Sequence, residues 1–232
     1  MGFPVSHRVL PNPPTMGTVF TRSSKLKPPA SHIAMALPYA AILIGLHGLG
    51  SAWLAILLYH AGIALYLLRA KRENLTSSLL RGWDPASGAA LSLLCVGNGP
   101  LLVILWPMVA IEPGSLSTGL TTAGLGGVSG WLFAGYYVSV HPVLEEALWR
   151  GALFSDRRGI AASDVAFAGY HALVLPYFVR IGWVPVVCVI LALVAWMWRR
   201  AVRNFHGLAI PIVTHALAGL ATMAAAYILA NR

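Results

Sequence analysis

The feature that most restricts the fold of this chain is a series of seven apolar stretches, each close to the length of a bilayer-spanning helix. They lie near residues 33–48, 50–68, 88–111, 128–154, 160–178, 183–198 and 208–230. A helix needs about 20 apolar residues to cross the hydrocarbon core of a membrane. Since backbone polar groups must be satisfied within the bilayer, we expect an all-α, polytopic transmembrane bundle of about seven helices.

Composition supports an integral, multi-pass membrane protein. The chain is 58% hydrophobic and only 10% charged, whereas soluble domains carry about 25% charged residues. Cys95 and Cys188 both lie in apolar runs, so neither a disulfide framework nor a cysteine metal site is indicated. The net charge of +9 is typical of basic loops that face a membrane surface. We therefore expect the lipid bilayer as a partner, and no nucleic acid.

The basic residues also predict domain organisation and orientation. Residues 1–32 are polar, rich in proline and free of acidic residues, so we expect a disordered basic tail followed by a transmembrane domain over residues 33–231. If the N-terminus is cytoplasmic, 14 of the 16 basic residues fall on the cytoplasmic side, with Arg180 and Arg232 outside. The positive-inside rule therefore favours seven helices with the N-terminus inside and the C-terminus outside.

Three charged residues interrupt the otherwise uncharged run from Val128 to Phe154, namely Glu145, Glu146 and Arg150. Ionisable groups inside a bilayer are rare and usually mark function. Glu146 and Arg150 are four residues apart with the acid first, which favours an ion pair on one helix face. Glu145 points about 100° away and has no cation four residues later. The spacing therefore predicts that Glu146 holds the structure and that Glu145 reacts.

Two histidines, His171 and His215, lie in later apolar stretches. A helix rise of ~1.5 Å per residue places Glu145, His171 and His215 roughly 10–15 Å from the same membrane face. Small residues flank all three and allow membrane helices to approach closely. A carboxylate and an imidazole around one water form a general base, and a second imidazole can donate to an oxyanion. The three groups predict hydrolysis of an amide bond.

The same residues resemble a known family. The motif E-E-x-x-x-R occurs at residues 145–150, F-x-x-x-H runs from Phe167 to His171, and His215 is a late membrane histidine. In order and spacing these motifs are similar to those of the CAAX protease and bacteriocin-processing (CPBP, or Abi) family of glutamic intramembrane proteases. The motifs cover roughly residues 144–220.

The resemblance implies a role for each residue. Glu145 and His171 would activate a water, His215 would stabilise the oxyanion, and Glu146 and Arg150 would hold the site together. The chain would then be an endopeptidase that cleaves a membrane-associated peptide or protein near the cytoplasmic face of a bacterial plasma membrane. It would use neither a cofactor nor a metal.

One position departs from the family pattern. The family usually has Asn or Asp four residues after the last histidine, where this chain has Gly219. Loss of one oxyanion donor costs about 10²–10³ in rate, unless a neighbour such as Thr214 replaces it. Gly219→Asn is therefore expected to raise or preserve activity. His141 lies four residues before Glu145 on the same face, and the sequence leaves open whether it tunes Glu145 or only packs.

Three alternatives remain. Gly219 would also suit a weak or inactive relative that acts as a membrane binding or immunity protein. Zinc held by Glu145, His171 and His215 would give a metal-dependent variant of the same hydrolase. A transporter or proton relay would also use buried Glu and His residues, but it predicts paired half-repeats that the sequence does not display.

Overall fold

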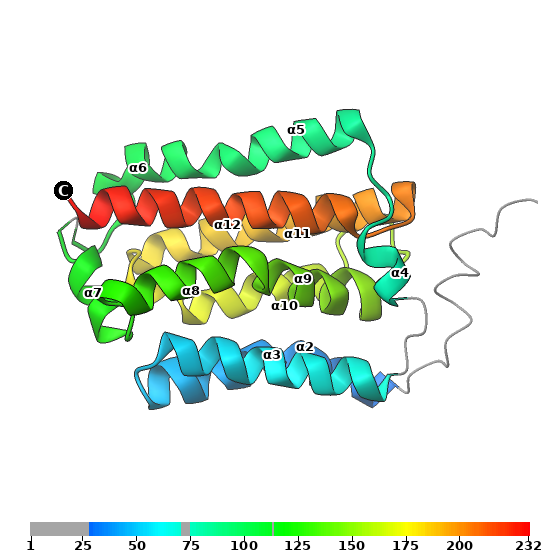
Figure 1. Ribbon diagram of the computed structural model, residues 1–232, viewed down its shortest axis with the longest axis horizontal. Helices are drawn as coiled ribbons and strands as arrows, with labels where there is room; N and C mark the ends of the chain where they lie inside the picture. The colour runs from blue at the N-terminus through cyan, green and yellow to red at the C-terminus, as the bar shows by residue number, and fades with distance from the viewer. Residues whose placement is uncertain (1–27, 71–74, 113) are drawn as a thin grey trace, which may run out of the picture.

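The computed structural model describes residues 28–70, 75–112 and 114–232, which form a bundle of helices (Figure 1). Within these residues there is no β-sheet, and a single antiparallel bridge joins Ala110 to Val179. The predicted all-α class is therefore confirmed. The first 27 residues of the expected N-terminal tail lie outside the described residues, so the tail stays a prediction.

The bundle is built from long helices joined by short helical turns. In chain order the elements are α2 (Pro28–Ile42), η1 (Leu43–Gly48), α3 (Ala52–Arg69), α4 (Leu75–Leu79), α5 (Pro85–Val96), α6 (Asn98–Val109), α7 (Leu116–Thr122), α8 (Gly127–Ser139), α9 (His141–Glu146), η2 (Ala147–Ala152), α10 (Ala162–Tyr170), η3 (His171–Leu173), η4 (Leu175–Tyr177), η5 (Ile181–Trp183), α11 (Val184–Phe205) and α12 (Ala209–Ala230).

Five helical segments of the described chain are long and apolar enough to cross a membrane. They are Ser31–Gly48, Ala52–Arg69, Pro85–Val109, Ile181–Phe205 and Ala209–Ala230. These correspond to five of the seven apolar stretches identified in the sequence. The other two, near residues 128–154 and 160–178, fold as broken helices, so the expected count of about seven is approximate.

The stretch near 128–154 is broken beside the acidic pair. α8 ends at Ser139, and α9 starts at His141 with Pro142 in its first turn, where the missing N–H of proline costs nothing. The chain then widens into the π-helical turn η2, in which the Leu153 N–H donates to the Leu148 carbonyl at 2.8 Å. Such turns inside helices are frequent at functional sites. Here α9 and η2 together present both glutamates to the interior.

The stretch near 160–178 is helical only to Tyr170. It continues as the short 3₁₀ turns η3 and η4 and then pairs with the end of α6. The Arg180 N–H donates to the Val109 carbonyl at 2.8 Å, and the Ile111 N–H donates to the Phe178 carbonyl at 3.1 Å. Backbone groups freed from the helix are thereby satisfied within the protein, as a membrane interior requires.

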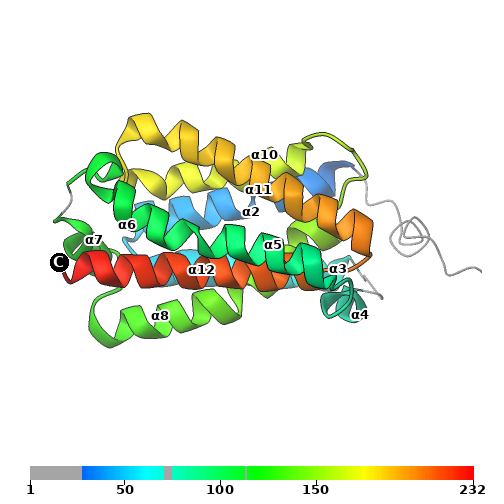
Figure 2. The ribbon, with the colours of Figure 1, turned by 90° about the horizontal axis from the view of Figure 1, so that it is seen from above.

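Helix α12 runs through the middle of the bundle. Figures 1 and 2 show it beside α5 and α6, with α8 along another side. The hairpin of α2 and α3 lies on the far side of α9 and α10 from α5 (Figure 1). The main core between these layers is aromatic, and Tyr59, Trp149, Phe167 and Trp198 are among its buried members. The site described below lies within this core.

A buried ion pair anchors the loop between η2 and α10 to helix α11. Arg199 donates through Nε and a terminal nitrogen to the Asp164 carboxylate at 3.0 and 2.7 Å. The same guanidinium donates to the carbonyls of Ser155 at 3.0 Å, Gly159 at 2.6 Å and Arg157. Because the buried Arg199 side chain makes all of these hydrogen bonds, its loss would leave the Asp164 carboxylate and three backbone carbonyls without this donor.

We expect Arg199→Met to lower the free energy of unfolding by about 3–5 kcal/mol, because it leaves the buried Asp164 carboxylate unpaired. The measurement is thermal unfolding of the purified protein in detergent. Arg200→Met is the matched control, since Arg200 is exposed and lies 5.8 Å from the Trp196 ring centre. Equal melting temperatures for the two variants would contradict this role for Arg199.

Candidate functional site

The carboxylate of Glu145 is fully buried at the centre of the bundle. Its Oε1 accepts hydrogen bonds from the hydroxyls of Tyr59 on α3, at 2.6 Å, and Tyr170 on α10, at 2.8 Å. The Tyr59 hydroxyl in turn accepts from the Trp149 indole N–H at 2.8 Å. Two donors from two other elements, one of them supported by Trp149, therefore orient this carboxylate and satisfy one of its two oxygens.

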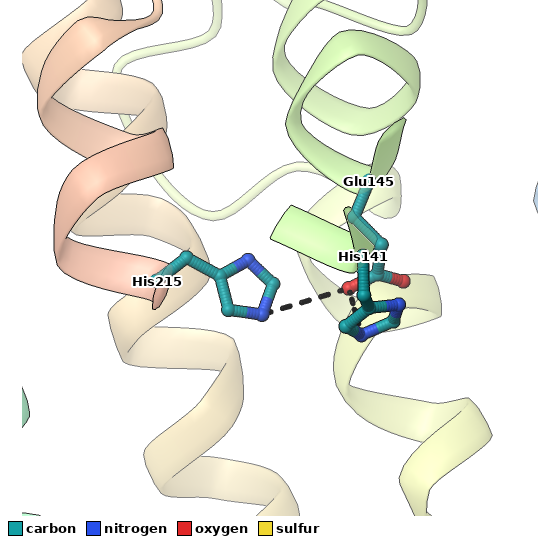
Figure 3. A group of neighbouring side chains, drawn as sticks. All are labelled: His141, Glu145 and His215. Atoms are coloured by element: carbon teal, nitrogen blue, oxygen red, sulfur yellow. Dashed lines mark ion pairs between the residues drawn. The ribbon is translucent and has the colours of Figure 1, made fainter. Parts of the chain in front are cut away.

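The other oxygen of Glu145, Oε2, is buried and has no hydrogen-bond partner among the described residues. Two imidazole nitrogens face it, His141 Nε2 at 3.3 Å and His215 Nε2 at 3.8 Å. Figure 3 shows the two rings approaching the carboxylate from different segments of the chain. Oε2 of Glu146 is also buried without a hydrogen-bond partner among the described residues, but its carboxylate is paired with Arg150. Of these two oxygens, Oε2 of Glu145 is the one that imidazole nitrogens of His141 and His215 face.

Glu146 is held in the structure through one of its two carboxylate oxygens. Its Oε1 accepts from Arg150 at 3.0 Å and from His215 Nδ1 at 2.8 Å. The Arg150 guanidinium lies over the rings of Phe167 and Trp198, at 4.3 and 4.9 Å from their centres. The ion pair predicted from the sequence spacing is present, and the rings supply cation–π contacts that replace lost hydration.

His215 bridges the two glutamates. An ionised carboxylate can only accept, so the 2.8 Å contact with Glu146 places a proton on His215 Nδ1. The ring also stacks on Trp198, with centres 4.7 Å apart. Nδ1 is thereby held on Glu146 while Nε2 faces Glu145. The structure thus brings His215 and Glu145 together, as the sequence predicts.

His171 lies beside this group and makes no hydrogen bond to Glu145 in the described structure. Its Nδ1 donates to the Phe167 carbonyl at 3.0 Å, which leaves the lone pair on Nε2. Its ring stacks on Tyr170, with centres 4.1 Å apart. Of the three residues predicted to converge, His171 therefore contacts the carboxylate only through its neighbour Tyr170.

His141 takes the place next to Glu145 that was expected for His171. It is buried, and its Nδ1 is 3.0 Å from Nε2 of His60. His60 Nδ1 is in turn 2.6 Å from the Tyr136 hydroxyl. A chain of hydrogen bonds thus runs from Tyr136 on α8 through His60 on α3 to His141 on α9, and Nε2 of His141 lies 3.3 Å from Oε2 of Glu145. His141 therefore lies directly against the Glu145 carboxylate in the structure.

Sequence reasoning missed three of these residues, Tyr59, His60 and Tyr170. A signal was present, since the dipeptide Tyr-His occurs at residues 59–60 and again at 170–171, and both tyrosines bond to Glu145. The repeated dipeptide alone does not identify a site, because nothing in the sequence places α3 against α9.

Gly219 lies against an aromatic ring. A Cβ added there would be 3.3 Å from Cε1 of Tyr137, and this ring stacks on His141 with centres 4.6 Å apart. Tyr137 thus lies against the position where the family has Asn or Asp. Thr214, the expected substitute donor, gives its hydroxyl hydrogen to the Ile210 carbonyl at 2.8 Å and is not directed at the site.

One group of side chains could hold a metal ion. It consists of His141, Glu145 and His215, whose ligand atoms all lie within 4.8 Å of one another. This set differs from the zinc ligands considered from the sequence, because His141 replaces His171.

We expect Arg150→Met to lower the free energy of unfolding by about 3–5 kcal/mol, because the buried Glu146 carboxylate loses its cation. Thermal unfolding in detergent measures the effect. The matched control is Arg158→Met, which removes an exposed arginine of the following loop. If Arg150→Met unfolds at the control temperature, the ion pair does not hold the site together.

Residues 126–221 match the model of the Rce1-like family, described as type II CAAX prenyl endopeptidase Rce1-like. No curated protein and no solved structure matches the chain. The match confirms the resemblance found in the sequence and the prediction of a peptidase. Together with the five apolar helices, it indicates an integral membrane protein of the protease type.

Proposed function

Starting from this match to CAAX prenyl endopeptidases, we propose that the protein is an intramembrane endopeptidase in which Glu145 activates the hydrolytic water. One observation supports this most directly. Oε1 of Glu145 is held by two tyrosine hydroxyls, whereas Oε2 is buried and faces imidazoles without a hydrogen-bond partner. A carboxylate with one fixed and one available oxygen is suited to accept a proton from water.

In the proposed reaction, a water lies between Oε2 of Glu145 and Nε2 of His171. The lone pair on His171 Nε2 follows from the bond of its Nδ1 to the Phe167 carbonyl. The water oxygen attacks the peptide carbonyl carbon, and its proton passes to Glu145. When the carbon–nitrogen bond breaks, this proton is transferred to the leaving amine, so a carboxylic acid and an amine are formed.

His215 would stabilise the tetrahedral intermediate. Its Nδ1 is held by Glu146, so a protonated His215 has its second N–H on Nε2, which faces the reacting side of Glu145. A preorganised donor at a developing oxyanion accounts for about 10²–10³ in rate. Glu146 and Arg150 then act as positioning residues, because they orient His215.

We further propose a location for the reaction. The ends of α3, α4 and α11 and the loop after η2 lie at one end of the bundle, opposite the C-terminus (Figure 1), and they include most of the described arginines. The positive-inside rule assigns this end to the cytoplasm. The substrate would be a membrane-associated peptide or protein cleaved near the cytoplasmic face of a bacterial plasma membrane, with the N-terminus of the enzyme inside.

A second candidate function is a weak or inactive relative that binds a membrane partner. Gly219 favours it, because the position lacks the family's amide or carboxyl group and Thr214 does not replace that group. The wild-type protein in liposomes would then fail to cleave any probe. The first probe is a farnesylated peptide with a CAAX end, chosen from the family match, beside an unprenylated membrane-anchored peptide.

We expect Glu145→Gln to abolish cleavage in proteoliposomes by at least 10³-fold, because the amide cannot accept the proton of the water. The fold should survive, since the amide oxygen still accepts from Tyr59 and Tyr170. Glu112→Gln is the matched control, because Glu112 is exposed in the loop after α6. Turnover near wild type in Glu145→Gln would show that another group activates the water.

The structure changes the expectation for Gly219→Asn. The added side chain requires the Tyr137 ring to move, since the Cβ would lie 3.3 Å from it. We therefore expect no gain in cleavage from Gly219→Asn alone, and a gain over Tyr137→Ala when the two changes are combined. Cleavage rates in a double-mutant cycle measure this coupling. A single variant faster than wild type would show that the ring already leaves room.

A further inference from the structure

We propose that His141, Glu145 and His215 form a binding site for one divalent transition-metal ion of the Zn²⁺ type. The site shares Glu145 and His215 with the proposed function but is detected by metal binding and not by cleavage. The two proposals can therefore fail separately.

The distances suit a metal of this size. Glu145 Oε2 lies 3.3 Å from His141 Nε2 and 3.8 Å from His215 Nε2, and all three atoms fit within 4.8 Å. Ligand atoms around tetrahedral zinc are roughly 3.3–3.5 Å apart, given metal–ligand distances of about 2.0–2.2 Å. Figure 3 shows both rings directed at the carboxylate.

The contacts of Glu145 Oε2 with the two imidazoles also resemble those of metal ligands more than those of hydrogen-bonded groups. Oε2 of Glu145 has no hydrogen-bond partner although His141 Nε2 is 3.3 Å away. A buried carboxylate oxygen without a partner is costly, and a cation placed among the three atoms removes that cost. Among the described residues Glu146 is paired with Arg150, whereas Glu145 has only histidines as ion-pair partners.

A second layer of hydrogen bonds prepares His215 as a ligand. Metal-binding histidines almost always donate their other ring N–H to a carboxylate, a carbonyl or a water. Here His215 Nδ1 donates to Glu146 at 2.8 Å, so the neutral ring has its lone pair on Nε2, toward Glu145. The carboxylate–histidine pair found behind zinc ligands is therefore already in place.

His141 has a comparable support. Its Nδ1 contacts His60 Nε2 at 3.0 Å, and His60 Nδ1 contacts the Tyr136 hydroxyl at 2.6 Å. When Tyr136 accepts from His60, His60 accepts from His141, and the lone pair of His141 is left on Nε2. Each imidazole is thus oriented by its own partner, and three protein ligands leave a fourth position open for water.

The assignment excludes His171 from the ligands. Its Nδ1 is bound to the Phe167 carbonyl, and it is not part of the group whose ligand atoms converge. An ion bound as proposed would also occupy the lone pair of Oε2 that accepts the proton in the proposed hydrolysis. Metal-loaded protein is therefore expected to lose cleavage, and a chelator is expected to restore it.

The test is a titration of the chelator-treated full-length protein in detergent with Co²⁺, followed by displacement with Zn²⁺. We expect one equivalent of Co²⁺ with the visible absorption bands of a tetrahedral site. Glu145→Gln and His141→Ala should weaken binding at least tenfold, and His60→Phe should weaken it about 10–100-fold through the second layer. His171→Ala and His47→Ala should bind like wild type, since His47 is exposed and contacts the Leu173 carbonyl.

Absence of Co²⁺ binding, binding that survives His141→Ala, or binding lost in His171→Ala would each overturn the metal site. Glu145→Gln keeps the shape of the side chain, so it tests the ligand set even if His141→Ala does not fold. Cleavage by Glu145→Gln would overturn the proposed hydrolysis and leave the Co²⁺ result unaffected.

Discussion

The structure depends on how one helix buries two adjacent carboxylates. In a medium of low dielectric each charge needs its own compensation, because an uncompensated buried charge is strongly destabilising. The charge of Glu146 is stabilised by Arg150 and His215. For Glu145, one oxygen is stabilised by hydrogen bonds from Tyr59 and Tyr170. These donors come from four other parts of the chain. The acidic pair thus fixes the positions of α3, α10 and α12 around α9.

This requirement also explains where the helices are irregular. The π-helical turn η2 and the break at Val140 lie on either side of the glutamates, and both are buried or close to buried residues. Irregular backbone inside a membrane is tolerated where protein surrounds it. The same holds for the turns after Tyr170, whose freed backbone groups pair with the end of α6. The broken segments surround the site, whereas the five long apolar segments form its support.

The sequence predicted the interactions that depend on spacing along one helix. It did not predict the interactions that depend on contacts between helices. The pairing of Glu146 with Arg150 follows from four residues of separation, and the structure contains it. The relation of Glu145 to Tyr59 and His60 depends on how α3 packs, which no local pattern specifies. Hydropathy identified the apolar stretches but averaged over the breaks that Pro142 and Pro176 accompany. The depth estimate predicted His171 beside Glu145, whereas in the structure the direct contact is made by His141, one turn away on the same helix.

Both proposals for the site depend on what binds to Oε2 of Glu145. Both tyrosines bind the other oxygen, so the protein orients the carboxylate without using Oε2. A proton from water and a divalent cation are the two partners that a buried anionic oxygen accepts most readily. His215 serves either case, as a donor when protonated and as a ligand when neutral, because Glu146 fixes only its Nδ1. Hydrolysis and metal binding would therefore compete for the same atoms.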